Sequence, residues 1–98
     1  MKRLFVTGIG TDVGKTLISA IIVEKLQADY WKPIQAGDLE NTDSMKVSQW
    51  LENSTSVIHP EAFRLSEPIS PHAAAERDGA TIDLNNIMCP ETKGDLVI

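Results

Sequence analysis

The chain has 98 residues, a net charge of −5 and a hydrophobic content of 42%, which are ordinary values for a globular protein in water. The acidic balance argues against nucleic acid as a partner, because the nine basic residues are scattered rather than gathered into a patch. No apolar run approaches the ~20 residues that span a bilayer, and the first residues lack a signal-peptide layout, so we expect a cytoplasmic protein that does not enter a membrane.

The first predicted elements are a short buried strand at residues 4–6, a loop at residues 7–16 and a helix that follows it. The loop has the sequence TGIGTDVGKT. Strand, glycine-rich loop and helix are the context of a phosphate-binding loop. The helix is predicted to be amphipathic, ~12 residues long and packed on a sheet. Its expected apolar face contains Ile18, Ile21, Ile22, Val23 and Leu26.

The loop has the chemistry of a nucleoside triphosphate site. Its glycines let successive N–H groups turn towards a phosphate chain, and the following helix N-terminus favours anions. Lys15 would contact the β- and γ-phosphates, and the hydroxyl of Thr16 would ligate Mg²⁺. The spacing departs from GxxxxGK[ST], since five residues separate Gly8 from Gly14. The alternative is a glycine-rich turn in which Lys15 is solvated.

Further along the chain, the sequence predicts alternating strands and helices. Residues 30–35 form a predicted strand in which Pro33 limits ladder pairing. A helix is predicted over residues 42–52, where Trp50 is expected to pack rather than to stack on a ligand. Extended pieces are expected at residues 57–58 and 62–65, short helices at 71–76 and 83–88, and a final strand at 95–98.

This order predicts an α/β fold: a P-loop NTPase-like, doubly wound, mainly parallel sheet with flanking helices. Such a sheet needs several βαβ units of ~30 residues each, and this chain supplies few strands and stops on one. We therefore expect residues 1–98 to be the N-terminal part of a single P-loop ATP-binding domain whose C-terminal half is absent. Cys89 is the only cysteine, so neither an intrachain disulfide nor a cysteine metal cluster can form.

Four motifs in order resemble the N-terminal part of the dethiobiotin synthetase family. They are the loop, the segment WKPIQAG at residues 31–37, the pair Thr42 and Asp43, and SPH at residues 70–72. The resemblance covers the whole chain in patches. Members of that family are roughly twice as long, and an acidic, glycine-rich stretch follows their equivalent of residues 95–98.

The resemblance implies an enzyme that uses ATP and Mg²⁺ to close the ureido ring of dethiobiotin from 7,8-diaminopelargonic acid and CO₂. One amine captures CO₂ as a carbamate, the γ-phosphate is transferred to it, and the second amine displaces phosphate. Both the carbamate and the triphosphate are anionic, so cations must be placed in advance. The resemblance also implies a homodimer for the full-length protein.

Carried over by position, the family's functional residues fall into four groups. The nucleotide-binding residues would be Asp12, Val13, Gly14, Lys15, Thr16, Leu17 and Asp43. Lys32 and Lys15 would be catalytic, Thr11, Lys32 and Ala36 would contact the substrate, and Thr16 and Asp43 would ligate Mg²⁺. Without the resemblance, Lys32 would read as a surface lysine and Asp43 as one of two possible helix caps.

Two positions depart from the family pattern: Ala36 replaces a small hydroxyl residue, and Asp12 replaces a frequent glutamate. A further metal-binding acid, the base pocket and much of the dimer surface would lie in the absent half. His59 and His72 lack metal-ligand spacing. Two alternatives remain open. One is another deviant P-loop ATPase or amidotransferase-type synthase, although Gly10 stands where partitioning ATPases carry a signature lysine. The other is a non-catalytic nucleotide-binding fragment.

Overall fold

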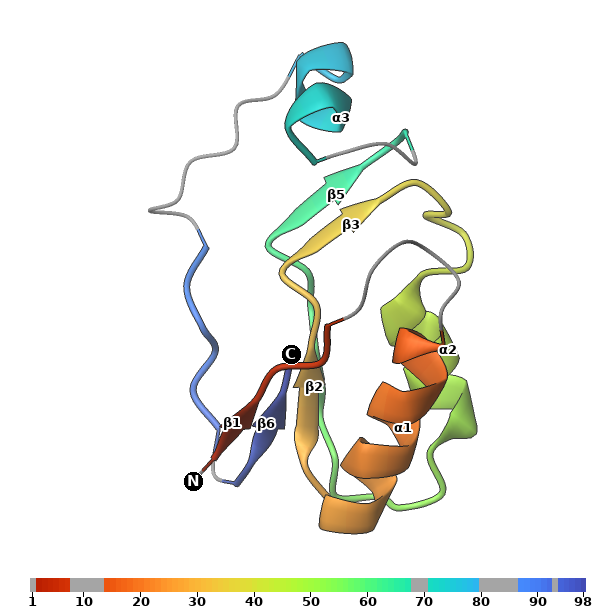
Figure 1. The fold of residues 1–98 in the computed structure, drawn as a ribbon, viewed down its shortest axis with the longest axis vertical. Helices are drawn as coiled ribbons and strands as arrows, with labels where there is room; N and C mark the ends of the chain where they lie inside the picture. Colours follow the sequence, from red (N-terminus) through yellow and green to blue (C-terminus); the bar gives the residue numbers. More distant parts are fainter. Residues whose placement is uncertain (1, 8–13, 68–70, 80–86, 93) are drawn as a thin grey trace.

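The computed structural model describes residues 2–7, 14–67, 71–79, 87–92 and 94–98. Strands and helices alternate along much of this length (Figure 1). In chain order they are β1 (Arg3–Leu4), α1 (Lys15–Leu26), β2 (Asp29–Trp31), β3 (Ile34–Ala36), α2 (Asp43–Trp50), β4 (Ile58–His59), β5 (Phe63–Leu65), α3 (Pro71–Arg77) and β6 (Leu96–Val97).

The strands form two parallel sheets. The larger has the order β1-β6-β2-β4, so the last strand of the chain lies between the first strand and β2. Val97 pairs with both Leu4 and Tyr30 across this sheet. The smaller sheet pairs β3 with β5, and α3 packs against both strands. The predicted α/β architecture with a mainly parallel sheet is therefore confirmed.

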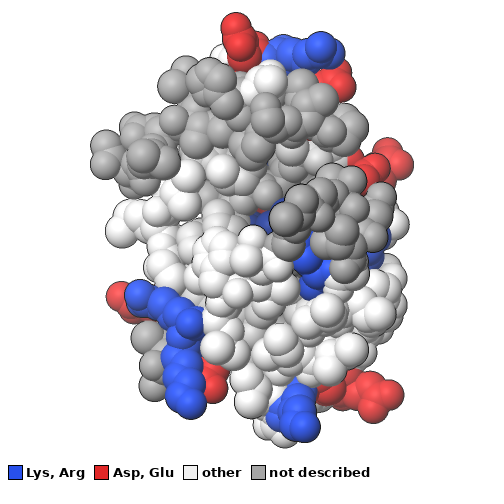
Figure 2. All heavy atoms as spheres, in the orientation of Figure 1, with Lys and Arg blue, Asp and Glu red and all other residues white. Residues whose placement is uncertain are grey.

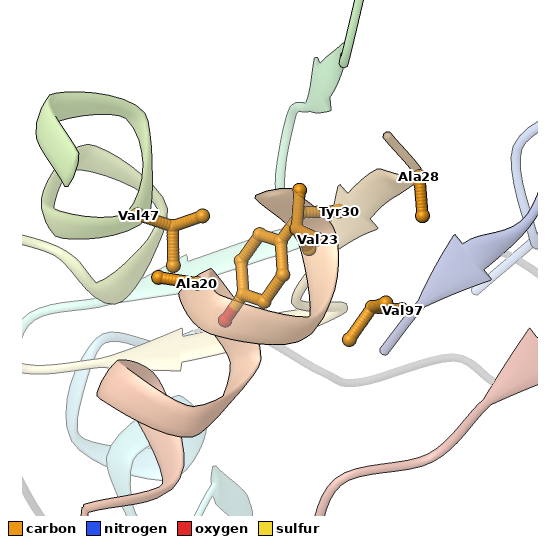
Figure 3. Close-up of a cluster of buried hydrophobic side chains, with 6 residues drawn as sticks. All are labelled: Ala20, Val23, Ala28, Tyr30, Val47 and Val97. Carbon is orange, nitrogen blue, oxygen red and sulfur yellow. The ribbon is translucent and has the colours of Figure 1, made fainter. Parts of the chain in front are cut away.

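Helices α1 and α2 lie side by side over the larger sheet (Figure 1). The core between them and the sheet is small and built from short side chains around one aromatic ring (Figure 3). Its buried members are Ala20, Val23, Ala28, Tyr30, Val47 and Val97. This cluster fixes both helices relative to β2, and the N-termini of the two helices take part in the site described below.

The predicted apolar face of α1 is only partly confirmed, because Val23 is buried and Ile22 packs against the core, whereas Ile18, Ile21 and Leu26 are exposed. Its buried residues are Ser19, Ala20 and Val23, whereas Ile18 and Ile21 are 50% and 57% exposed. The helix has apolar residues on most of its circumference, so the spacing of apolar residues in the sequence does not show which face meets the sheet. Small residues let the helix approach the sheet closely. The larger side chains of Leu17 and Ile21 line an open groove of about 440 Å³ with Trp50, which is 48% exposed rather than packed.

Other predicted bounds differ from the structure by a few residues. The strand expected at residues 4–6 is β1, and the strand at 30–35 is split into β2 and β3. Helix α2 ends before the expected residue 52. Of the helix predicted at 83–88, only Ile87 and Met88 are described, and both lie in irregular backbone. In the described residues, no helix has both the length and the apolarity needed to cross a bilayer.

The burial of Val47 in the core leads to a testable prediction. Val47 is completely buried between α2 and the sheet, while Val57 is 51% exposed. We expect Val47→Ala to lower the free energy of unfolding by about 2 kcal/mol, because a buried valine side chain contributes about this much. The matched change Val57→Ala should cost under about 0.5 kcal/mol. Urea unfolding measures both, and equal losses would contradict this core assignment.

Glu24 joins the end of α1 to the segment that follows α2. Its carboxylate accepts hydrogen bonds from the backbone N–H of Glu52 (3.1 Å) and of Asn53 (2.7 Å), and from the Asn53 side-chain amide (2.9 Å). The Glu52 bond is the largest cause of a lowered pKa for Glu24, and the Asn53 side chain adds to it. Ionised Glu24 therefore stabilises the chain reversal between α2 and β4.

This contact predicts a pH-dependent loss of stability. Because the folded pKa lies below the ordinary value of 4.5, the stabilisation is fully present above pH 4.5 and is lost as the pH falls through the folded pKa. We expect Glu24→Gln to be less stable than the unchanged chain at pH 7, with the difference shrinking at pH 3. Urea midpoints at both values test this. Glu40→Gln is the control, since Glu40 is exposed, and a Glu24 difference that is constant with pH would refute the assignment.

Candidate active site at the start of two helices

The first part of the site is the N-terminus of α1. Gly14 is the N-cap residue and has a φ of +83°, a left-handed conformation that favours glycine. A Cβ at this position would meet no neighbouring atom, so the backbone conformation and not a lack of space favours glycine here. Glycine offers no side chain to cap the first helical N–H groups. A helix start of this kind, with Lys15 and Thr16 in its first turn, favours a bound phosphate.

The second part is a break in the strand that contains Lys32. β2 ends at Trp31 and β3 begins at Ile34. Pro33 has no N–H for a ladder, but its carbonyl oxygen accepts from the backbone N–H of Ala62 (2.8 Å) and of Phe63 (3.0 Å). Lys32 consequently follows the carboxyl end of a parallel strand, where ligands bind in open α/β sheets. This placement agrees with the predicted position at the exit of a strand.

The third part is the start of α2. Thr42 is the N-cap, and its Oγ1 accepts from the backbone N–H of Met45 at 3.1 Å. The open choice between Thr42 and Asp43 as cap is thereby settled in favour of Thr42. Asp43 occupies the first helical position instead, so its carboxylate is available to groups outside the helix.

These three parts meet at Asp43. The Nζ of Lys32 donates to Asp43 Oδ2 at 2.5 Å, and the hydroxyl side chain of Thr16 also hydrogen-bonds to this carboxylate. The exposed fractions of the Lys32 and Asp43 side chains are 31% and 27%. Burial raises the pKa of Asp43, but the Lys32 hydrogen bond and charge, the Thr16 hydrogen bond and the charge of Lys46 outweigh it. The net pKa is lowered, and Asp43 is a stable anion.

Two further residues close to this cluster were not predicted. Tyr30 is buried beneath it, and its pKa is raised far above the usual range by burial and then by the charges of Asp43 and Glu61. Glu61 is only 9% exposed. Its Oε1 lies 3.7 Å from Arg64 Nε, and its Oε2 has no hydrogen-bond partner among the described residues. Glu61 therefore adds negative charge next to the Lys32 strand break.

The position of Glu61 results from a shift in strand register. Trp31 pairs with His59, an offset of 28 (59 − 31), whereas Ile34 pairs with Phe63, an offset of 29 (63 − 34). One extra residue is thus accommodated opposite Lys32 and Pro33, and Glu61 lies in this bulge. The Trp31 indole N–H also donates to the carbonyl of Pro60 at 3.2 Å. Pro33 and Pro60 hint at irregular pairing in the sequence, but the register itself is a tertiary property.

Hard oxygen ligands suit Mg²⁺, and Thr16 and Asp43 supply a hydroxyl and a carboxylate within hydrogen-bonding reach of each other. The donor set therefore fits a magnesium ion that completes its coordination with phosphate oxygens and water. No group of three His, Cys, Asp or Glu side chains suited to a metal occurs in the described parts of the chain. A metal held by protein carboxylates alone is therefore not indicated there.

Two of the remaining predicted site residues, Leu17 and Ala36, lie in other surroundings. The side chain of Leu17 lines the open groove with Trp50, so only its backbone could face a phosphate at the helix start. The methyl group of Ala36 packs near Leu65 and Ala75. Thr11, Asp12 and Val13 fall outside the described residues. His59, expected to be structural, pairs with Asp29 at 2.9 Å.

The charged side chains on one face of the molecule form separate groups (Figure 2). Lys and Arg appear at several places along its margin, with some basic atoms in a recess near the middle of the view. The basic atoms of the described residues that are visible on this face do not form a continuous band. The positive charge that the described structure brings to the site is local and comes from individual lysines such as Lys32 and Lys46.

A glycine-started helix beside a strand-end lysine and a helix-start aspartate is the arrangement of a nucleotide-dependent P-loop protein. A family model described as AAA domain matches residues 2–98. The chain therefore belongs to this AAA domain family.

Curated relatives match nearly the whole chain. Those from Christiangramia forsetii, Cytophaga hutchinsonii and Chlamydia pneumoniae are each named ATP-dependent dethiobiotin synthetase BioD. They are 60%, 54% and 50% identical over 99%, 100% and 100% of this chain, which covers 47%, 48% and 43% of their own lengths. The chain thus spans about half the length of the curated relatives that it matches.

The cap of α2 can be tested separately from the site chemistry. Thr42→Ala removes the hydrogen bond to Met45 N–H, so we expect a loss of about 1 kcal/mol in the free energy of unfolding. Amide hydrogen exchange at Met45 should also become faster. Ser48→Ala, an exposed change in the same helix, should be neutral or slightly stabilising. Unchanged exchange at Met45 in Thr42→Ala would show that the cap does not hold the helix start.

Proposed function

We propose that the protein to which this chain corresponds is an ATP- and Mg²⁺-dependent dethiobiotin synthetase. It would carboxylate 7,8-diaminopelargonic acid with CO₂ and close the ureido ring by forming C–N bonds. The observation that carries the proposal is the meeting of Thr16, Lys32 and Asp43 in one cluster. The names of the relatives support the same activity. In this proposal the enzyme is cytoplasmic and a homodimer.

Each residue of the cluster has a proposed task. Lys15, at the start of α1, would bind the β- and γ-phosphates of ATP. Thr16 and Asp43 would hold Mg²⁺, which when bound would neutralise charge on the phosphates. Lys32 would lie against the carbamate and the γ-phosphate and stabilise the negative charge that develops between them. Thr11, Asp12 and Val13 of the loop, and the backbone of Leu17 and Ala36, would complete the nucleotide and substrate contacts.

The position of Lys32 supports this proposed task, because Lys32 lies between β2 and β3 and belongs to neither strand. It follows β2, precedes Pro33 and reaches the start of α2. A lysine amine on a flexible stem can move between a carboxylate and an anionic substrate over a few ångströms. Orienting two anions next to each other is the main difficulty of the reaction, so a cation at this position would lower its barrier.

The activity is tested by ATP-dependent phosphate release with Mg²⁺, measured with and without diaminopelargonate and bicarbonate. The assay should be run on the 98-residue chain and on a longer polypeptide of the relatives' length that contains it. Release that requires the diamine supports the proposal. A non-catalytic nucleotide-binding fragment would bind ATP without release, and another ATPase would release phosphate without needing the diamine. The chain covers only about half of the relatives' length, so the assay must also test the alternative of a non-catalytic fragment.

Two lysine variants separate binding from turnover. We expect Lys15→Ala to reduce ATP affinity at least about 10-fold, because it removes a charge from the phosphates. Lys32→Ala should leave ATP affinity within about threefold but lower turnover at least about 100-fold, since its charge acts mainly in the transition state. Equilibrium binding of a fluorescent ATP analogue and phosphate release measure the two effects. Full turnover in Lys32→Ala would refute its role.

A further inference from the structure

The cluster contains an interaction that the proposed function does not by itself require. Lys32 is hydrogen-bonded to Asp43 Oδ2 at 2.5 Å, and Asp43 is the carboxylate assigned to the metal. Thr16, the other assigned ligand, is hydrogen-bonded to the same carboxylate. The ammonium of Lys32 therefore occupies the carboxylate that a divalent cation would need. The negative charge of Asp43 in turn neutralises the positive charge of Lys32.

We propose that Lys32 and the divalent cation compete for Asp43, so that metal binding releases the Lys32 ammonium to bind the anionic substrate. This inference rests on the proposed function, because it takes Asp43 as a metal ligand and Lys32 as an anion ligand. It assigns Lys32 a second role, which is to set the metal affinity of the site.

Charge and burial favour an exchange of one cation for another. Asp43 is about three-quarters buried, so its carboxylate is stable only with a positive partner. Lys46 already adds positive charge nearby without making an ion pair to Asp43 among the described residues. A lysine and a divalent cation on the same Oδ2 would repel each other strongly at that distance. Metal binding should therefore displace Lys32.

Lys32 is exposed enough to leave Asp43. Its side chain is 31% exposed, and within the part of the chain that the structure describes it hydrogen-bonds only to Asp43. Once released, its ammonium regains full capacity to attract an anion. Metal binding and anion binding would then be positively coupled, and by linkage the anion should also raise metal affinity. The pair thus prevents Lys32 from capturing an anion before the metal is present.

Mn²⁺ binding followed by electron paramagnetic resonance, without nucleotide, tests the competition directly. The variants are Lys32→Met, which removes the competitor, and Lys46→Met, a matched change that removes a nearby charge but no ion pair between described residues. We expect Lys32→Met to bind Mn²⁺ about three- to tenfold more tightly, the range of a partly exposed charged hydrogen bond, and Lys46→Met less than about twofold more tightly. Circular dichroism and thermal unfolding check that the variants fold.

Unchanged or weaker Mn²⁺ binding in folded Lys32→Met would overturn the proposal, as would an equal increase in Lys46→Met. If Lys32→Met does not fold, reductive ¹³C-methylation of the unchanged chain gives a second measurement. Its Lys32 methyl signal should shift when Mg²⁺ is added, more than that of Lys46. An unshifted Lys32 signal at saturating Mg²⁺ would contradict the release of Lys32.

A third variant distinguishes this inference from the proposed function. Asp43→Asn should lose most Mn²⁺ binding if Asp43 is a metal ligand. Wild-type binding in Asp43→Asn would refute the metal assignment that both ideas use. If Asp43→Asn loses binding but Lys32→Met gains none, the competition fails while the proposed function stands. If the competition holds but phosphate release does not require the diamine, only the proposed function fails.

Discussion

The ion pair between Lys32 and Asp43 is the interaction on which the rest of the site depends. It joins the end of β2 to the start of α2, and the hydrogen bond from Thr16 connects it to the start of α1. Three elements that lie apart in the sequence thereby meet at one carboxylate. Since Asp43 is partly buried, this anion needs the positive charge of Lys32. The same requirement is the basis for the divalent cation that we propose at this location.

A helix cap, two backbone hydrogen bonds and core packing hold these three side chains in place. The hydroxyl of Thr42 caps α2 and so leaves the Asp43 carboxylate outside the helix. The Pro33 carbonyl accepts hydrogen bonds from the backbone N–H groups of Ala62 and Phe63, and these bonds fix the strand break after Lys32. Tyr30 packs with Val23 and Val47 in the core that joins α1, α2 and β2 (Figure 3). The charge of Asp43 acts on Tyr30, so this core lies close to the ion pair.

Much of this arrangement could be predicted from local sequence signals. Gly14 before α1, Thr42 before α2 and Pro33 after Lys32 each favour a particular local backbone conformation. What could not be predicted depends on packing between distant segments. Because α1 has apolar residues on most of its circumference, the sequence does not show which face meets the sheet. Ile18 and Ile21 were therefore predicted to face the core although they are exposed. Glu61 reaches the site only through a register shift between parallel strands, and no local pattern specifies such a shift.

The enzyme that we propose joins two amines and CO₂ into a cyclic urea. The most direct test is the fate of ¹³C-bicarbonate incubated with diaminopelargonate, ATP and Mg²⁺, using the 98-residue chain and a longer polypeptide of the relatives' length that contains it. The account predicts a ¹³C-labelled cyclic product from the longer polypeptide, detected by mass spectrometry, that disappears when ATP is omitted. No labelled product from either, despite tight ATP binding, would contradict it.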